Sequence, residues 1–240
     1  MRVSREVLLR LKRRHRGYLI VLAMQVLLLL LLPLAQHAPW LLSVLMISLS
    51  SVLIAFVSRF SPLRRTKPLV YSLGAIAVLM EVVWHVGLRF NPALGQWLTI
   101  PHVLVWLIFL VLVLLRKVRT LINEPYVTTS VVLGAASGYL LVGIAGGVML
   151  IAISALSPLS LTVANLSKAT VISAASAGVV ADAPSLMAAS FNMLTTVGTP
   201  VVNPTDVLGQ VAVTIITVSG QLYVAILIAL ILGRYHKRKP

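Results

Sequence analysis

The chain lacks cysteine altogether and contains only five acidic residues. Without cysteine it has no disulfide scaffold, no thiolate metal ligands and no cysteine nucleophile. The acidic residues are too scattered to act as a pair in acid–base chemistry: Glu6, Glu81, Glu124, Asp182 and Asp206. The histidines do not have the spacing of zinc ligands, and no phosphate-binding GxxxxGK[ST] loop is present. We therefore expect neither enzymatic activity nor a cofactor.

Charge of either sign is scarce. Only 10% of the 240 residues are charged, whereas 59% are hydrophobic, and the mean hydropathy is +1.02. An ordinary soluble domain has about 25% charged residues, and one soluble core could not hide this much apolar surface. We expect an all-α, multi-pass integral membrane protein, located in the plasma membrane by default or in an internal membrane.

Six apolar runs are long enough to cross a membrane at roughly 20 residues each. They cover about residues 18–34, 40–57, 69–88, 98–115, 127–156 and 207–232. The first run follows a basic segment, as in a signal peptide, but it is longer than a usual signal core. The residues at its end, 35–37, also lack a small-x-small cleavage site. We interpret it as a retained helix.

The lysines and arginines predict the orientation. Eighteen of the twenty lie in the N-terminus, in the loops after the second and fourth spans, and in the C-terminus; the other side holds Arg89 and Lys168. The positive-inside rule therefore predicts six spans with both termini cytoplasmic. The net charge of +15 suggests contact with anionic lipid headgroups. Nucleic-acid binding is not expected, because the basic residues are spread over four short segments without interleaved aromatics.

A short helix is predicted before the last span. Asp182 can cap a helix whose first turn holds Pro184, and 185–195 contains no breaker. A helix over 183–195 would be roughly 17 Å long, too short to span the membrane but suited to a re-entrant half-helix. Its C-terminal end would deliver carbonyl groups to the middle of the bilayer, where a cation is the natural occupant.

The residues after this helix read Thr195-Thr196-Val197-Gly198, which is similar to the start of the potassium-channel filter T-T-V-G-Y-G-D. Pro204 falls where many members have a proline, and the sequence GQLYVAILIA at 220–229 looks like an inner helix of prokaryotic two-helix pore modules. From about residue 125 to 235, the order of these segments resembles that in the pore module of tetrameric cation channels (the prokaryotic ion channel family).

The resemblance implies an organisation and a function. The basic N-terminus (1–17) and a four-helix membrane domain (18–119) would precede a pore domain (120–235) and a basic C-terminus (236–240). The pore domain would contain the half-helix, the filter (195–200) and the inner helix (207–232). Four copies would surround a central pore in a homotetramer. The implied ion-binding filter is Thr195, Thr196, Val197, Gly198 and Thr199, with potassium or another monovalent cation at Thr196, Val197 and Gly198.

The outer half of the filter departs from the family pattern. Thr199 stands in place of the usual Tyr, Pro200 in place of the second Gly, and Val201 in place of the Asp. Pro200 cannot adopt the positive φ that the replaced Gly often uses. We expect the selectivity of a cation channel with this filter to be altered or lost. The alternative is a channel-derived subunit that does not conduct and that serves a structural or regulatory role with an unknown membrane partner.

The last span carries polar residues on one face. Gln210, Thr214, Thr217 and Gln221 are spaced by 4, 3 and 4 residues. They predict a water-filled cavity below the filter, lined by Thr214, Thr217 and Gln221, or hydrogen bonds to neighbouring helices. Gly220 is a gating hinge by resemblance, or a point of close helix packing. Small-xxx-small glycine pairs in the fifth span, 134 with 138 and 143 with 147, predict close packing.

The first four spans do not read as a voltage sensor, because 98–115 contains no Arg or Lys. The ionisable residues inside them are Glu81, His85 and His102. Glu81 and His85 are four residues apart and share a helix face. They are either a pH-sensing pair or a satisfied polar contact inside the bundle.

Overall fold

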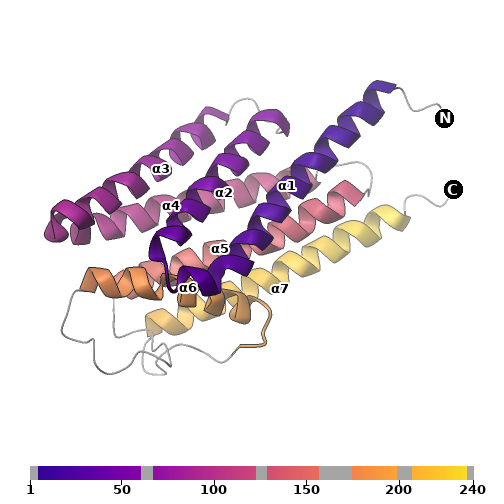
Figure 1. Ribbon diagram of the computed structural model, residues 1–240. Helices are drawn as coiled ribbons and strands as arrows, with labels where there is room; N and C mark the ends of the chain where they lie inside the picture. The colour runs from indigo at the N-terminus through magenta and orange to yellow at the C-terminus, as the bar shows by residue number, and fades with distance from the viewer. Residues whose placement is uncertain (1–4, 61–66, 123–128, 157–174, 199–206, 237–240) are drawn as a thin grey trace.

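The computed structural model describes residues 5–60, 67–122, 129–156, 175–198 and 207–236 (Figure 1). Within these ranges the chain is all-α, as predicted. Its helices are α1 (Arg5–Ala35), α2 (Pro39–Phe60), α3 (Lys67–Phe90), α4 (Pro92–Ile122), α5 (Thr129–Leu156), α6 (Ala175–Leu194) and α7 (Val207–His236). The N-terminal end of α1 and the C-terminal end of α7 lie at the same end of the bundle, on the right in Figure 1.

Helices α1 to α5 and α7 each contain a segment that is long and apolar enough to cross a membrane. The shortest is Trp40–Ser58 in α2, whose 19 residues are roughly 28 Å long. This length is close to the roughly 30 Å hydrocarbon core of a bilayer. The six predicted spans are confirmed, and the protein is an integral multi-pass membrane protein.

Helix α4 extends beyond the predicted fourth span. Arg116, Lys117 and Arg119 were expected in a loop after Leu115, but they lie inside the helix, which continues to Ile122. Arginine and lysine are good helix formers, so the end of an apolar run need not end the helix. Lys117 is 3% exposed and therefore belongs to the interior of the bundle rather than to its surface.

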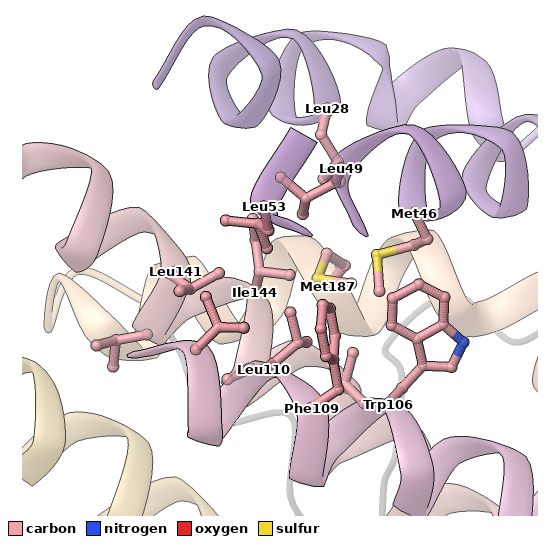
Figure 2. Packing of buried hydrophobic residues seen from close by; sticks show 14 of the residues in the cluster. Leu28, Met46, Leu49, Leu53, Trp106, Phe109, Leu110, Leu141, Ile144 and Met187 are labelled. Atoms are coloured by element: carbon pink, nitrogen blue, oxygen red, sulfur yellow. The ribbon is translucent and has the colours of Figure 1, made fainter. Parts of the chain in front are cut away.

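Helix α5 occupies the centre of the bundle. It packs against α1, α4, α6 and α7. In the 18-residue apolar window of its candidate span 61% of the residues are buried, whereas in that of α7 only 17% are buried, so α7 lies at the edge. The core joins residues of α1, α2, α4, α5 and α6 (Figure 2), including Leu28, Met46, Leu49, Leu53, Trp106, Phe109, Leu110, Leu141, Ile144 and Met187.

The glycines of α5 let neighbouring helices approach, which confirms the packing predicted from their spacing. At Gly143 an added Cβ would overlap the Phe191 ring, and at Gly147 it would lie 2.9 Å from the Cα of Met187. The Ser190 hydroxyl donates a hydrogen bond of 2.7 Å to the carbonyl oxygen of Gly143. Because no side chain intervenes, α6 packs directly against the α5 backbone.

Helix α6 begins earlier than the sequence suggested. The helix expected over 183–195 starts at Ala175 and ends at Leu194, with Pro184 inside it rather than in its first turn. A proline removes one backbone hydrogen bond, and the packing of a bundle can offset that loss; here Ala183 and Leu186 are both buried. At 20 residues α6 is about 30 Å long, so length alone does not mark it as a half-helix. It is not one of the candidate spans found among the described residues.

Candidate functional site

The residues of the predicted filter close the C-terminal end of α6. The Thr196 N–H donates to the carbonyl oxygen of Met193, and the Val197 N–H donates to that of Asn192, both at 3.1 Å. These two bonds, with Thr196 at a φ of 59°, form a Schellman motif. Glycine or asparagine normally occupies this left-handed position, and a β-branched residue there carries strain.

The same turn is exposed on its outer side. Val197 is 84% exposed, and Thr195 and Thr196 are exposed as well. The Thr196 hydroxyl donates to the carbonyl oxygen of Thr195 at 2.6 Å. Thr199 lies outside the described residues. The assignment of ion binding to Thr195, Thr196, Val197 and Gly198 stays a prediction, since it depends on neighbouring copies around an axis.

The C-terminal end of α6 lies beside the middle of α7. The Thr217 hydroxyl donates to the carbonyl oxygen of Met193 at 3.3 Å. A Cβ added at Gly220 would lie 3.0 Å from the carbonyl oxygen of Leu194. Thr217 and Gly220 stand near the centre of the candidate span Val207–Leu230. The last carbonyl groups of α6 therefore lie at mid-depth of the neighbouring span.

The polar residues on one face of α7 lie in two different environments. Thr217 is partly buried and bonded to α6, which is the neighbouring-helix role anticipated as the alternative to cavity lining. Thr214 and Gln221 are exposed at the edge of the bundle. Gly220 packs against Leu194, and its role as a hinge stays a prediction. A single copy of the chain thus leaves part of a polar helix face uncovered.

A buried carboxylate lies between α3 and α4. Glu81 is 5% exposed, and its Oε2 atom is 2.6 Å from His102 Nε2. The Trp106 indole N–H donates to the same oxygen at 2.7 Å. His85, the partner suggested by sequence spacing, is farther away, with its Nδ1 atom 3.9 Å from Glu81 Oε1. The fold therefore brings Glu81 together with His102, which the sequence placed on a separate helix.

Aromatic rings and a cavity surround this pair. The Trp84 ring stacks on His102, with centroids 4.7 Å apart and planes 13° from parallel. The Trp84 indole N–H donates to Thr99 Oγ1 at 2.9 Å. A cavity of about 70 Å³ adjoins the pair and is lined by residues of α2 to α6: Leu42, Ser43, Met46, Glu81, Trp84, Thr99, His102, Val103, Trp106, Val148, Ile151, Ala183 and Met187.

A second set of buried polar side chains, which includes Lys117, connects helices across the bundle. Its ammonium group donates to the Ser137 hydroxyl on α5, and that hydroxyl donates to Gln25 Oε1 on α1 at 2.6 Å. Ser137 and Gln25 are fully buried. Gln25 and Ser137 were missed because they are isolated polar positions in apolar runs, 112 residues apart, and Lys117 was assigned to a loop. They link three helices, and the cavity that Lys117 lines has a volume of about 10 Å³, too small for a ligand.

No family profile, no curated protein and no solved structure matches the chain. Among the described residues no group of three or more His, Asp or Glu side chains could hold a metal ion. The class of the protein therefore follows from its own architecture, six long apolar helices in a multi-pass membrane protein.

Proposed function

We propose that the protein is a potassium-channel-like cation channel that forms a central pore as a homotetramer. The observation that carries the proposal is the position of the Thr195–Gly198 turn, which ends α6 at mid-depth of α7. A helix that ends inside the membrane presents carbonyl groups there, and these attract a cation. The sequence resemblance to the T-T-V-G filter falls on the same four residues.

The uncovered side of this region supports a cyclic assembly. Val197 and the α7 residues Thr214 and Gln221 are exposed in one copy of the chain. Polar side chains at membrane depth normally face protein or water rather than lipid. Four copies around an axis would place these residues toward a shared aqueous path. The departures at 199–201 argue for a selectivity different from that of strict potassium channels.

A second candidate is a channel-derived subunit that does not conduct. It is favoured by the Schellman cap, in which the carbonyl groups of Asn192 and Met193 accept bonds within the turn. A potassium filter needs successive carbonyl groups directed at a common axis. If the cap persists in the assembled protein, the fold is kept and the pore is closed.

Flux through the purified protein in liposomes distinguishes the two. We expect potassium and sodium flux from the wild type and a marked change in rate or ion preference in Thr196→Ala. Thr129→Ala is the matched control, since Thr129 is an exposed residue at the start of α5, away from the turn. Cross-linking in the membrane should report four copies. Assembly without flux under any gradient or pH would exclude conduction and favour the second candidate.

A further inference from the structure

We propose that Glu81 and His102 form a proton-binding site inside the membrane domain, and that its protonation state controls the packing of α6. The site and its effect on α6 do not depend on conduction. An effect on ion flux would rest in addition on the proposed function.

The charge of the pair depends on the protons that Glu81 and His102 hold. Glu81 Oε2 and His102 Nε2 are 2.6 Å apart, so one proton must lie between them. With only that proton and an unprotonated Nδ1 atom, the pair is a carboxylate with a neutral imidazole and carries a net charge of −1. A second proton on Nδ1 makes it a neutral carboxylate–imidazolium pair. Among the described residues both ion-pair contacts of Glu81 are with histidines, and none is with Lys or Arg. Without the second proton a net charge therefore remains in a buried site, which membrane interiors disfavour strongly.

The environment of the His102 imidazole favours the binding of a second proton. His102 is 6% exposed, and its Nδ1 atom has no hydrogen-bond partner among the described residues. The face of Trp84 covers the ring, and an aromatic face stabilises a cation placed over it. His102 thus has one nitrogen committed to Glu81 and a second nitrogen able to take a proton. If His102 only held the Glu81 carboxylate and the Trp106 indole in place, its second nitrogen would not need to be without a hydrogen-bond partner.

A partly exposed histidine lies next to the buried pair. The His85 side chain is 36% exposed, and it lies between the buried pair and the end of α3 at Phe90, roughly 8 Å away along the helix. Its Nε2 atom is 3.3 Å from the Ser43 hydroxyl, and its Nδ1 atom is 3.9 Å from Glu81 Oε1. The Nδ1 atom also lies 3.1 Å from the backbone carbonyl oxygen of Glu81, so His85 brings a partly exposed, protonatable group next to the carboxylate without a direct hydrogen bond to it.

The cavity beside the pair is also lined by residues of α6. The described residues of α5 and α6 that line the cavity are apolar: Val148 and Ile151, and Ala183 and Met187. The Asp182 side chain lies outside the described residues. Figure 2 shows Met46 and Met187 beside Trp106, whose indole N–H donates a hydrogen bond to Glu81. A cavity of about 70 Å³ has room for several waters, and a net charge at its wall favours their entry. Entry of water beside Met187 changes the packing of α6 on Gly147.

Tryptophan fluorescence tests the proton site directly. The variant Trp40→Phe/Trp97→Phe keeps Trp84 and Trp106, because the two replaced residues are 62% and 84% exposed and lie outside the site. In this background we expect a titration step with pH, since protonation of His102 quenches the stacked Trp84. The step should disappear in Glu81→Gln and in His102→Gln. It should persist in His37→Gln, because His37 is exposed and its Nδ1 atom lies 3.2 Å from the carbonyl oxygen of Pro33 in the preceding turn, away from the Glu81 site.

Thiol accessibility tests the effect on α6 without ion flux. The chain has no cysteine, so Val197→Cys places a single thiol at the end of α6. We expect its rate of modification by a charged thiol reagent in proteoliposomes to change several-fold with pH, and Glu81→Gln to abolish that change. A fluorescence step that survives in both Glu81→Gln and His102→Gln overturns the proton site. An intact step with a pH-independent modification rate overturns the control of α6. If both effects are present but no ion flux is measured, only the channel function is refuted.

Discussion

The close packing of α6 on α5 at Gly147 makes a quantitative prediction. A Cβ at Gly147 would lie 2.9 Å from the Cα of Met187, a backbone atom that cannot move without moving α6. Overpacking of this kind costs about 1–3 kcal/mol, and the gain from replacing glycine by alanine in a helix offsets about 0.5–1 kcal/mol of it. Gly147→Ala should therefore lower the free energy of unfolding by about 1 kcal/mol.

Gly87→Ala is the matched control, since the nearest atom to an added Cβ there is the Cα of Gly95 at 3.5 Å, an ordinary contact. This variant should be neutral or stabilising by up to about 1 kcal/mol. Both can be measured by reversible unfolding in mixed detergent micelles with increasing dodecyl sulfate, followed by circular dichroism. Equal stability of the two variants would refute the direct packing of α6 on the α5 backbone.

Three further predictions concern the polar contacts and the turn. Thr196→Gly should raise the free energy of unfolding by about 0.5–1 kcal/mol, because glycine adopts the φ of 59° without strain. Ser137→Ala should destabilise by about 1–3 kcal/mol, and more than Lys117→Met does, because it leaves a buried ammonium group without its acceptor. Trp84→Phe should cost about 0.5–1.5 kcal/mol through loss of the indole hydrogen bond to Thr99. The same unfolding assay measures all three.

Each of these has a control on the same chain. Thr195 does not have a positive φ, so Thr195→Gly should destabilise where Thr196→Gly stabilises. Destabilisation by both would argue that the cap is absent from the folded protein. Trp97 is 84% exposed, so Trp97→Phe should change stability little. If Lys117→Met proves more harmful than Ser137→Ala, the ammonium group has an acceptor beyond Ser137.

Several features could be predicted because they depend on neighbouring residues alone. A membrane span needs roughly 20 apolar residues in succession, so the six spans follow from the local sequence. The glycines at 143 and 147 recur at helical spacing, and that spacing identifies a face on which another helix can pack. The position of the T-T-V-G turn at the end of α6 also follows from the local order of residues.

Other features depend on contacts between distant segments. Glu81 and His102 are 21 residues apart on different helices, and Gln25 and Ser137 are 112 residues apart. No local pattern relates such positions. The start of α6 was misplaced because a proline is typical of the first turn of a helix, whereas Pro184 lies inside α6, where the packing of the bundle tolerates it.

The sequence by itself determined that this protein is embedded in lipid, where its six spans lie and the chemical character of the turn after α6. Hydropathy acts residue by residue, so lipid selects these segments before any helix meets another. Tertiary structure decided which buried polar groups meet: Glu81 with His102, Lys117 with Ser137, and the end of α6 with the middle of α7. A polar group in lipid must find a partner inside the protein, and only the packed bundle determines which one is within reach.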